Sequence, residues 1–265
     1  MVTVQPKTAR AGDAVLITVT GAARLPRGTA DGKPLVFFAA KRGYQAVFAV
    51  PLDTDDDTIA IDVDGVKQPA AIAVQAVTFP ETDVVVEDEF ANPPDRERAQ
   101  IDEDNHAILG ALSRDKRGPR FTRPFQRPHV RITSRFGEWR TFNDGHRSQH
   151  LGTDFKAREG SPVYAVNDGR VTLVRDTFLS GKVIVISHGA GISSAYFHLS
   201  APLVREGDDV RIGDPIARAG HTGRTTGPHL HLAIRVPGGF ANPISFSRLP
   251  IAPVQQAYAR RYRRL

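Results

Sequence analysis

Short apolar runs separated by turn residues extend along most of this 265-residue chain. The runs are rich in Val, Ile, Phe and Thr, and clusters of Gly, Pro, Asn and Asp lie between them. Such runs are typical of short antiparallel strands joined by tight turns. The sequence therefore predicts a mainly β fold that one helical segment interrupts.

Residues 1–90 contain runs such as AVLITVTG, YQAVFAVPL and TIAIDVDGV, separated by turns such as RGTADGKP. Several short strands with repeated turn signals are typical of an immunoglobulin-like β-sandwich, which we predict as the N-terminal domain. This part of the chain holds no histidine, so we expect no catalytic constellation there. Its acidic run DTDDD lacks the glycine and the closing glutamate of a calcium loop, and we interpret it as a solvated turn.

Residues 91–120 break this pattern and predict a connector. ANPPD ends the sheet, and Ile101, Ile108 and Leu112 then recur at roughly helical spacing among charged residues. We predict one helix over about Arg96 to Ser113. The proline-rich stretch RGPRFTRPFQRP follows it and is expected to lie over the next domain.

The strand-like pattern returns in residues 121–250. Within it, EGSPVYAVNDGRV and REGDDVRIGDPIARAG share a Glu-Gly turn, an apolar residue soon after it and a second glycine turn. This weak internal echo indicates a compact antiparallel β-roll or half-barrel built from hairpins, which we predict as the second domain. Residues 251–265 end in AYARRYRRL and are expected to form a basic tail.

The composition excludes several kinds of site. The chain has no cysteine, which excludes disulfides, cysteine-ligated zinc and a cysteine nucleophile. No apolar run approaches the ~18 residues of a membrane span. The start, MVTVQPKTARAGD, lacks the regions of a signal peptide, so either the protein is not exported or this sequence begins after a removed leader.

Charge is divided unevenly along the chain. Residues 1–94 hold 8 Lys and Arg against 13 Asp and Glu, whereas residues 95–265 hold 27 against 16. The basic second part favours an anionic partner, for which nucleic acid and an anionic cell-wall polymer are both candidates. The same charge also fits a soluble domain that has a positive surface and binds no anionic partner.

Two histidines in TGPHLHLAIRV, His229 and His231, define a candidate site. Side chains alternate between the faces of a strand, so both imidazoles are predicted to lie on one face. The intervening and following apolar residues point to the opposite face and back the pair with a hydrophobic layer: Leu230, Leu232 and Ile234.

A second segment, HLGTDF, supplies His150 and Asp154 four residues apart. Catalytic zinc sites typically use three protein ligands from His and Asp or Glu and keep a fourth position for water. His150, Asp154 and one histidine of the HLH pair provide that number. We therefore predict that these segments form a metal site.

A third segment, SSAYFHLS, carries Tyr196 and His198. Because they are two apart, we expect both on one strand face, with Phe197 and Leu199 on the other. A tyrosine and a histidine that face a metal cleft suit proton transfer and oxyanion stabilisation. Asn143, in the turn FNDGHRS, is a further candidate for a substrate contact.

These segments belong to four motifs that occur in one order: SRFGEWRTFNDGHRSQHLGTDF, GSPVYAVNDGRV, SGKVIVISHGAGISSAYFHLS and EGDDVRIGDPIARAGHTGRTTGPHLHLAIR. Together they resemble the lysostaphin-like (LytM-type) zinc metallopeptidases over about residues 115–245. That family hydrolyses peptide bonds of peptidoglycan, in the stem peptide or its cross-bridge. The resemblance implies an exported protein of the periplasm or cell wall that acts on peptidoglycan rather than on nucleic acid.

The resemblance also implies a role for each histidine. His150, Asp154 and His231 match the ligands of one Zn²⁺ per chain, and His229 and His198 match two non-ligand histidines near the attacking water. The chain has no HExxH helix and therefore no glutamate base from that motif. One of the two histidines is expected to take the proton and the other to stabilise the oxyanion, in either order.

Other interpretations predict different residues. A LytM-type module that has lost its zinc would bind the wall or activate an amidase, and degenerate copies lack ligands that are all present here. A lipoyl or biotinyl carrier needs a modifiable lysine at a hairpin tip, whereas Lys182 is the only lysine in residues 160–265 and lacks that context. An iron oxygenase with two histidines and a carboxylate usually places the first histidine and the carboxylate two apart, not four.

Overall fold

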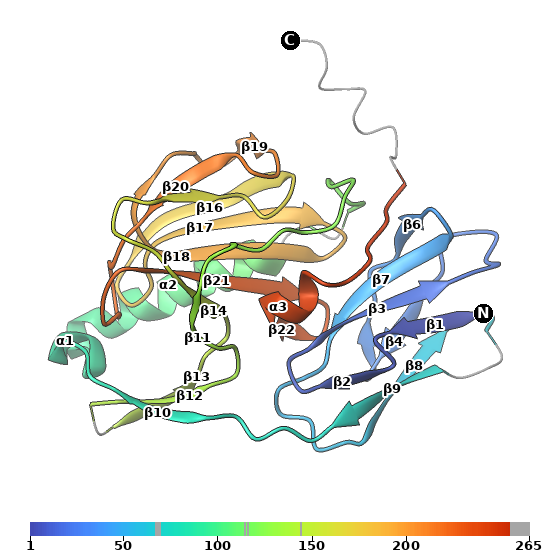
Figure 1. Cartoon of the computed structure of the whole chain (residues 1–265), viewed down its shortest axis with the longest axis horizontal. Helices are drawn as coiled ribbons and strands as arrows, with labels where there is room; N and C mark the ends of the chain where they lie inside the picture. The colour runs from blue at the N-terminus through green and yellow to red at the C-terminus, as the bar shows by residue number, and fades with distance from the viewer. Residues whose placement is uncertain (67–69, 114, 116, 144, 255–265) are drawn as a thin grey trace, which may run out of the picture.

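The computed structural model describes residues 1–265 apart from 67–69, 114, 116, 144 and 255–265. Figure 1 shows two β-rich lobes, the N-terminal one in blue at the right and the C-terminal one in yellow to red at the left. The prediction of a mainly β fold is confirmed. In the described part of the chain, no helix is long and apolar enough to cross a membrane. Most of the predicted basic tail, from residue 255 on, lies outside the described residues.

The N-terminal lobe consists of two sheets that face each other. Its strands are β1 (Val2–Gln5), β2 (Thr8–Arg10), β3 (Ala14–Val19), β4 (Gly28–Ala30), β5 (Lys33–Pro34), β6 (Phe38–Ala40), β7 (Gly43–Ala49), β8 (Thr58–Val63) and β9 (Ala70–Gln75). One sheet has the order β1-β3-β7-β6 and the other the order β2-β9-β8-β4-β5. Alternating residues of both sheets, such as Ile17, Phe48 and Ile61, form the core between them. The immunoglobulin-like topology expected from the sequence stays a prediction.

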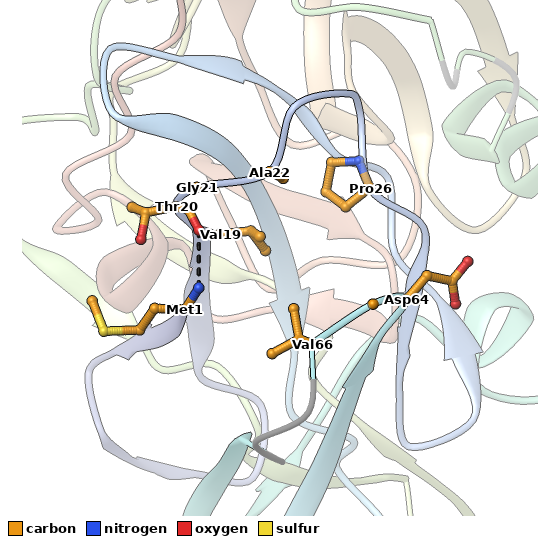
Figure 2. Close-up of a pocket in the computed structure, with 9 residues that line it drawn as sticks. Met1, Val19, Thr20, Gly21, Ala22, Pro26, Asp64 and Val66 are labelled. Atoms are coloured by element: carbon orange, nitrogen blue, oxygen red, sulfur yellow. Dashed lines mark hydrogen bonds between the residues drawn. The ribbon is translucent and has the colours of Figure 1, made fainter.

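A small pocket lies at one end of this lobe (Figure 2). It has a volume of about 400 Å³ and is lined by the chain start, the turn after β3 and the turn after β8. The Met1 amine donates to the Thr20 carbonyl oxygen at 2.9 Å across its rim. Among the described residues that line it, Asp64 is the one with a titratable side chain.

The C-terminal lobe is built on a ten-stranded sheet. Its strands are β11 (Ile132–Ser134), β14 (Thr153–Lys156), β15 (Pro162–Tyr164), β16 (Gly169–Thr177), β17 (Gly181–Gly189), β18 (Ile192–Pro202), β19 (Asp209–Val210), β20 (Pro215–Ala219), β21 (His229–Val236) and β22 (Gly239–Ala241). The main path runs β11-β14-β21-β18-β17-β16-β19, and every pairing in it is antiparallel. Among the described residues this sheet does not close into a barrel.

The two faces of this sheet pack against different parts of the protein. Ile184, Leu230 and Leu232 point to one face, into a core that continues into the N-terminal lobe. Val183 and Val185 point to the other face, where helix α2 (Asp95–Ser113) covers them. The alternation predicted for the HLH strand is therefore confirmed, and His229 and His231 lie on the face that α2 partly covers.

Helix α2 begins one residue before the predicted start and ends at the predicted end. Ile108, Ala111 and Leu112 pack on β17 and β18. Asp104 is buried, and its carboxylate accepts from Arg175 Nε at 2.9 Å and from the Phe178 amide at 3.0 Å. These bonds fix the helix across the sheet and leave the remaining part of the same face for the histidines.

The two lobes share one continuous core. Side chains of β3, β6 and β7, among them Leu16, Phe38 and Val47, pack in the same cluster as β17 and β21 of the C-terminal lobe. Backbone hydrogen bonds also cross the junction, from Asn242 N to Gly12 O at 2.8 Å and from Ala49 N to Pro237 O at 2.9 Å. The domain limits expected at residues 90, 120 and 250 stay predictions, but the two lobes have no solvated linker holding them apart.

A third sheet lies over the face of the C-terminal lobe that carries His229. It contains β10 (Glu81–Val84), β12 (Trp139–Phe142) and β13 (His146–Gln149) in the order β10-β12-β13. Strand β10 comes from the segment after the N-terminal lobe and pairs parallel with β12. The short helices α1 (Asp88–Ala91) and α3 (Pro243–Phe246) complete the fold.

Candidate metal centre

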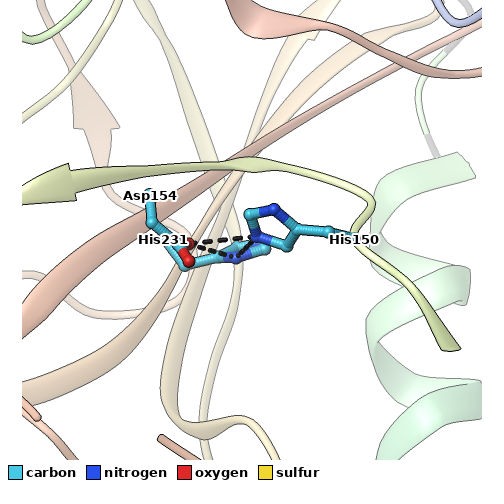
Figure 3. A group of neighbouring side chains, drawn as sticks. All are labelled: His150, Asp154 and His231. Atoms are coloured by element: carbon cyan, nitrogen blue, oxygen red, sulfur yellow. Dashed lines mark hydrogen bonds and ion pairs between the residues drawn. The ribbon is translucent and has the colours of Figure 1, made fainter. Parts of the chain in front are cut away.

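His150, Asp154 and His231 converge on one point of the large sheet (Figure 3). His150 Nε2 lies 3.1 Å from Asp154 Oδ1 and 2.9 Å from His231 Nδ1, and His231 Nδ1 lies 2.9 Å from Asp154 Oδ1. Register explains the meeting, because Asp154 on β14 is the Cα partner of His231 on β21. Among the described residues, no other three His, Cys, Asp or Glu side chains gather so closely.

This triangle fits a zinc ion. Zinc bonds of 2.0–2.2 Å at tetrahedral angles place ligand atoms about 3.3 Å apart, close to the observed separations. Two imidazole nitrogens and one carboxylate oxygen are the donor set of many catalytic zinc sites. His150 and Asp154 are each 5% exposed, so their desolvation favours a bound cation over isolated polar groups.

The backbone determines which nitrogen of His150 faces the centre. His150 Nδ1 donates to the Arg135 carbonyl oxygen at 2.8 Å, which leaves the lone pair on Nε2. A ligating histidine usually has such an outer partner, which fixes its ring and tautomer. His231 presents Nδ1 instead, and its Nε2 side faces the backbone of Gly152.

Gly152 gives a test of this packing. A Cβ atom there would overlap the His231 ring and lie 2.7 Å from the Leu232 carbonyl oxygen. We expect Gly152→Ala to displace His231 and to lower zinc affinity by about 10-fold or more, as displaced metal ligands do. Zinc per chain and competition with a chelator measure this. Gly239→Ala is the control, because nothing lies within 4 Å of its added Cβ. Equal zinc affinity in both variants would contradict the assigned geometry.

Asp154 remains ionised in this setting. Burial alone would raise its pKa, but the contacts of Oδ1 with the rings of His150 and His231 hold the pKa well below its usual range. Its second oxygen, Oδ2, accepts from Arg140 Nη2 at 2.7 Å. The carboxylate therefore presents Oδ1 to the two imidazoles and Oδ2 to the guanidinium.

His231 is kept neutral by its surroundings. Burial is the main reason that its pKa falls to about 4, and the Asp154 carboxylate only partly offsets this effect. A metal ligand must be unprotonated, so a lowered pKa favours ligation at neutral pH.

His229 lies beside the triangle rather than in it. Its Nδ1 donates to the Gly227 carbonyl oxygen at 2.8 Å, so the lone pair is on Nε2. That nitrogen is 3.6 Å from Asp154 Oδ1. His229 therefore directs a proton-accepting nitrogen toward the centre without completing the set of ligands.

His198 reaches the same cleft through an irregular strand. Lys182 and Ile184 of β17 pair with Leu199 and Tyr196, so β18 carries one extra residue between these pairs. Such a β-bulge re-aims side chains and is frequent beside active sites. His198 occupies the bulge with φ +58°, a conformation that a non-glycine residue rarely adopts without functional reason.

The bulge brings the two non-ligand histidines together. The rings of His198 and His229 have centroids 5.0 Å apart, and His198 Nδ1 donates to the Thr222 carbonyl oxygen at 2.9 Å. Burial, and then the nearby His229 and His231, lower the pKa of His198 to about 3. His198 is thus a neutral proton acceptor at neutral pH.

The expectation for Tyr196 is wrong. The extra residue in β18 turns Tyr196 and Leu199 into the core and places Phe197 and His198 on the metal side. Tyr196 is fully buried, and its hydroxyl accepts from the Val166 amide at 2.9 Å. Phe197 instead contacts the ring of His231, with centroids 4.9 Å apart. Tyr196 therefore cannot stabilise an oxyanion in the cleft.

A buried polar chain accounts for Tyr196. Its hydroxyl lies 3.1 Å from Ser194 Oγ, which lies 2.8 Å from His188 Nε2, and His188 Nδ1 donates to the Asp168 carbonyl oxygen at 2.8 Å. Burial raises the pKa of Tyr196 to about 12 and lowers that of His188 to about 4. His188 is thus a neutral core residue and lies apart from the metal centre.

His188 predicts a pH dependence of stability. The unfolded chain binds a proton at His188 near pH 6.5 and the folded chain only near pH 4, so the stabilisation is present above 6.5 and is lost as pH falls through this window. Between pH 7 and 5, the free energy of unfolding of the metal-free protein, measured in urea, should fall by about 2 kcal/mol more than that of His188→Gln. Equal losses in both proteins would show that His188 does not titrate as its burial requires.

Asn143 stays a predicted substrate contact. Its side chain is held by the segment after β10, accepting from the Val86 amide at 2.9 Å and donating to the Val86 carbonyl oxygen at 2.8 Å. It has φ +42°, which suits the turn between β12 and β13. These hydrogen bonds join Asn143 to Val86, which lines the cleft.

The cleft above the metal centre has a volume of about 520 Å³. Asp154, His198 and His229 lie in its floor, residues 82–86 form one wall and residues 224–228 form the other. Arg224 stacks on Phe142, with its guanidinium carbon 4.1 Å from the ring centroid. Sequence reasoning missed both this wall and Arg140, because neither stands out as a motif of its own.

Comparison with known proteins supports the site. The chain matches peptidase family M23 over residues 148–243, a range that contains both histidine pairs and the carboxylate described above. Residues 148–243 are an M23 peptidase domain. M23 peptidases are metallopeptidases, so the His-Asp-His group is the candidate for the metal of this M23 domain.

Two curated relatives share this region. The peptidoglycan DD-endopeptidase ShyA of Vibrio cholerae is 40% identical over 143 residues, which are 52% of this chain and 33% of the relative. The DD-carboxypeptidase/endopeptidase Mpg of Neisseria meningitidis is 40% identical over 137 residues, covering 49% of this chain and 30% of the relative. The chain thus spans about a third of the length of these relatives.

A solved structure shares the whole arrangement. A Pseudomonas aeruginosa crystal structure whose description names peptidase M23 aligns with a TM-score of 0.65, over 92% of this chain and 95% of that chain. Its sequence is 24% identical, so the likeness concerns the fold alone. The fold likeness nevertheless extends beyond the M23 domain to both lobes.

Proposed function

We propose that this protein is a zinc-dependent endopeptidase that hydrolyses peptide bonds in the stem peptides or cross-links of bacterial peptidoglycan. The observation that carries the proposal is the triangle of His150 Nε2, Asp154 Oδ1 and His231 Nδ1 beside a cleft that holds His198 and His229. The names of the relatives ShyA and Mpg support peptidoglycan as the substrate.

His150, Asp154 and His231 would hold one Zn²⁺ per chain. Zinc bound there would supply Lewis acidity, which polarises a peptide carbonyl and lowers the pKa of water. The protein positions these ligands through the Arg135 carbonyl oxygen and Arg140, so the site is preorganised before substrate enters. Asp154, His198 and His229 line the cleft beside these ligands, where a peptide would have access.

His229 and His198 would carry the proton. Each has Nδ1 bonded to a backbone carbonyl oxygen and keeps a lone pair on Nε2, so each can accept a proton when water attacks. His229 Nε2 is close to the ligand Asp154, so we assign it the first proton transfer. The protonated ring of His229 can later donate its proton to the leaving amine, and His198 would stabilise the oxyanion only with a proton on its own Nε2.

The cleft walls suit an extended peptide. Strand β10 is an edge strand with β12 on one side only, and extended peptides commonly add to such an edge. Arg224 and Lys156 line the same cleft and supply positive charge for the carboxylates of a stem peptide. These features favour a wall peptide over nucleic acid, and we place the protein in the periplasm or cell wall.

The alternative is a LytM-type module that binds the wall or activates an amidase without catalysis. All three ligand atoms and both histidines are placed for chemistry here, and no observation favours a silent module.

Digestion of defined muropeptides tests the proposal. The zinc-loaded protein should cleave one peptide bond, seen by mass spectrometry as two products that together gain one water, and a chelator should abolish the cleavage. Added zinc should restore it. Binding to sacculi without any cleavage would favour the silent module, and cleavage that resists complete removal of metal would overturn the proposed chemistry.

A further inference from the structure

We propose that Arg140 is a positioning residue that holds Asp154 in its ligating orientation, and that strand β10 supports Arg140 from outside the M23 domain. The inference rests on the proposed metal centre and adds residues that lie outside the range matched to the family, 148–243.

The contact between Arg140 and Asp154 is direct. Arg140 Nη2 donates to Asp154 Oδ2 at 2.7 Å, whereas Oδ1 of the same carboxylate faces His150 and His231. A charge-assisted bond to one oxygen fixes the rotation of a carboxylate and so fixes where the other oxygen points. Arg140 thereby determines which Asp154 oxygen is offered to the metal.

Arg140 itself is held on more than one side. The same Nη2 donates to Ser134 Oγ at 2.7 Å, and Nε lies 3.5 Å from Glu138 Oε2. Ser134 Oγ also donates a hydrogen bond to Glu138 Oε2. The side chain of Arg140 is only 19% exposed, so these partners, rather than solvent, decide its position.

The support continues into β10. Thr82 Oγ1 donates to Glu138 Oε1 at 2.6 Å, and Thr82 is also the Cα partner of Arg140 in the β10–β12 pairing. A continuous chain of polar contacts therefore runs from Thr82 through Glu138 and Arg140 to Asp154. Outer partners of this kind orient metal ligands and typically contribute about 10–100-fold to metal affinity.

A direct contact with substrate is the competing role for Arg140, because it lines the cleft. The two roles predict different measurements. A positioning residue changes zinc affinity and the electronic spectrum of a substituted metal when no substrate is present. A substrate contact changes KM and leaves the metal unaffected.

The test compares four variants with the wild-type chain. Arg140→Met removes the donor, Arg140→Lys keeps the charge without the planar fork, and Thr82→Val removes the far support. Arg147→Met is the matched control, since Arg147 pairs with Glu81 and stacks on Trp139 in the same small sheet without touching Asp154. Zinc Kd is measured by chelator competition and the site is monitored by Co²⁺ absorption.

We expect Arg140→Met to weaken zinc binding by about 10–100-fold and to alter the Co²⁺ spectrum, with Arg140→Lys intermediate. Thr82→Val should weaken zinc binding by a few-fold, and Arg147→Met should match the wild type. An unchanged zinc Kd and Co²⁺ spectrum in Arg140→Met would overturn the inference. If Arg140→Met does not fold, Arg140→Lys and Thr82→Val decide: wild-type zinc affinity in both overturns the inference.

The outcome separates this inference from the proposed function. A wild-type protein that binds no zinc or cleaves no muropeptide would defeat the proposed function itself. A wild-type protein that does both, beside an Arg140→Met protein with wild-type zinc affinity, would defeat only the role of Arg140.

Discussion

Zinc should be lost when His231 is replaced by alanine. His231 Nδ1 is one corner of the ligand triangle, and the two remaining ligands are too few to retain the ion against a chelator. Catalytic metals contribute several kcal/mol of transition-state stabilisation, so peptide hydrolysis should fall by more than about 10³-fold. Metal analysis after gel filtration measures the first effect and muropeptide digestion the second.

The folding of this variant is monitored separately. His231 alternates with core residues and makes only part of the packing of β21, so the variant should keep its β-type circular dichroism spectrum. A folded His231→Ala protein with one zinc per chain and full activity would show that His231 is not a ligand.

Replacing His229 should have a different result. Its Nε2 lies near Asp154 but outside the triangle, so His229→Ala should keep one zinc per chain. General acid–base groups contribute about 10²–10⁴-fold, and we expect kcat to fall by that amount with little change in zinc affinity.

The contrast between the two neighbouring histidines makes the prediction specific. If His229→Ala loses zinc as readily as His231→Ala does, His229 is a ligand and the assignment is wrong. If His229→Ala keeps both zinc and a kcat within a few-fold of wild type, the proton is handled elsewhere. His198→Ala then becomes the decisive variant, because His198 is the other proton acceptor in the cleft.

Regular strands made part of this site predictable. His229 and His231 lie on one strand, and the period of two correctly predicts a shared face with Leu230 and Leu232 on the other. Their meeting with His150 and Asp154 depends on strand order and register, which local pattern does not determine. For these residues, the resemblance to the lysostaphin-like family indicated the set of ligands, which the alternation of side chains along a strand could not.

The error at Tyr196 has its cause in irregular backbone. A single extra residue in β18 reverses the faces of Tyr196 and His198 relative to each other, and nothing in SSAYFHLS marks the position of a bulge. Asn143 occupies a turn in a left-handed conformation, which asparagine adopts more readily than most residues. Its hydrogen bonds with the Val86 backbone depend on the parallel pairing of β10 with β12, which lies far away in the sequence.

Arg140 and β10 show the same limit on the functional side. Residues 82–86 are no motif in the sequence, yet they form a wall of the cleft because β10 pairs with β12. The pairing also explains why Arg140, one arginine among many, meets Asp154. Residues that act through long-range register are visible only in the fold.

The metal centre itself is the central claim, and anomalous diffraction at the zinc edge tests it most directly. Crystals grown with zinc should show one strong anomalous peak per chain. The zinc ion at this peak should be bonded to His150 Nε2, His231 Nδ1 and one Asp154 oxygen. His198 and His229 should lie beside the ion without bonding to it. A zinc ion bonded to His229 in place of His231, or no peak within the triangle at saturating zinc, would contradict the assigned metal centre.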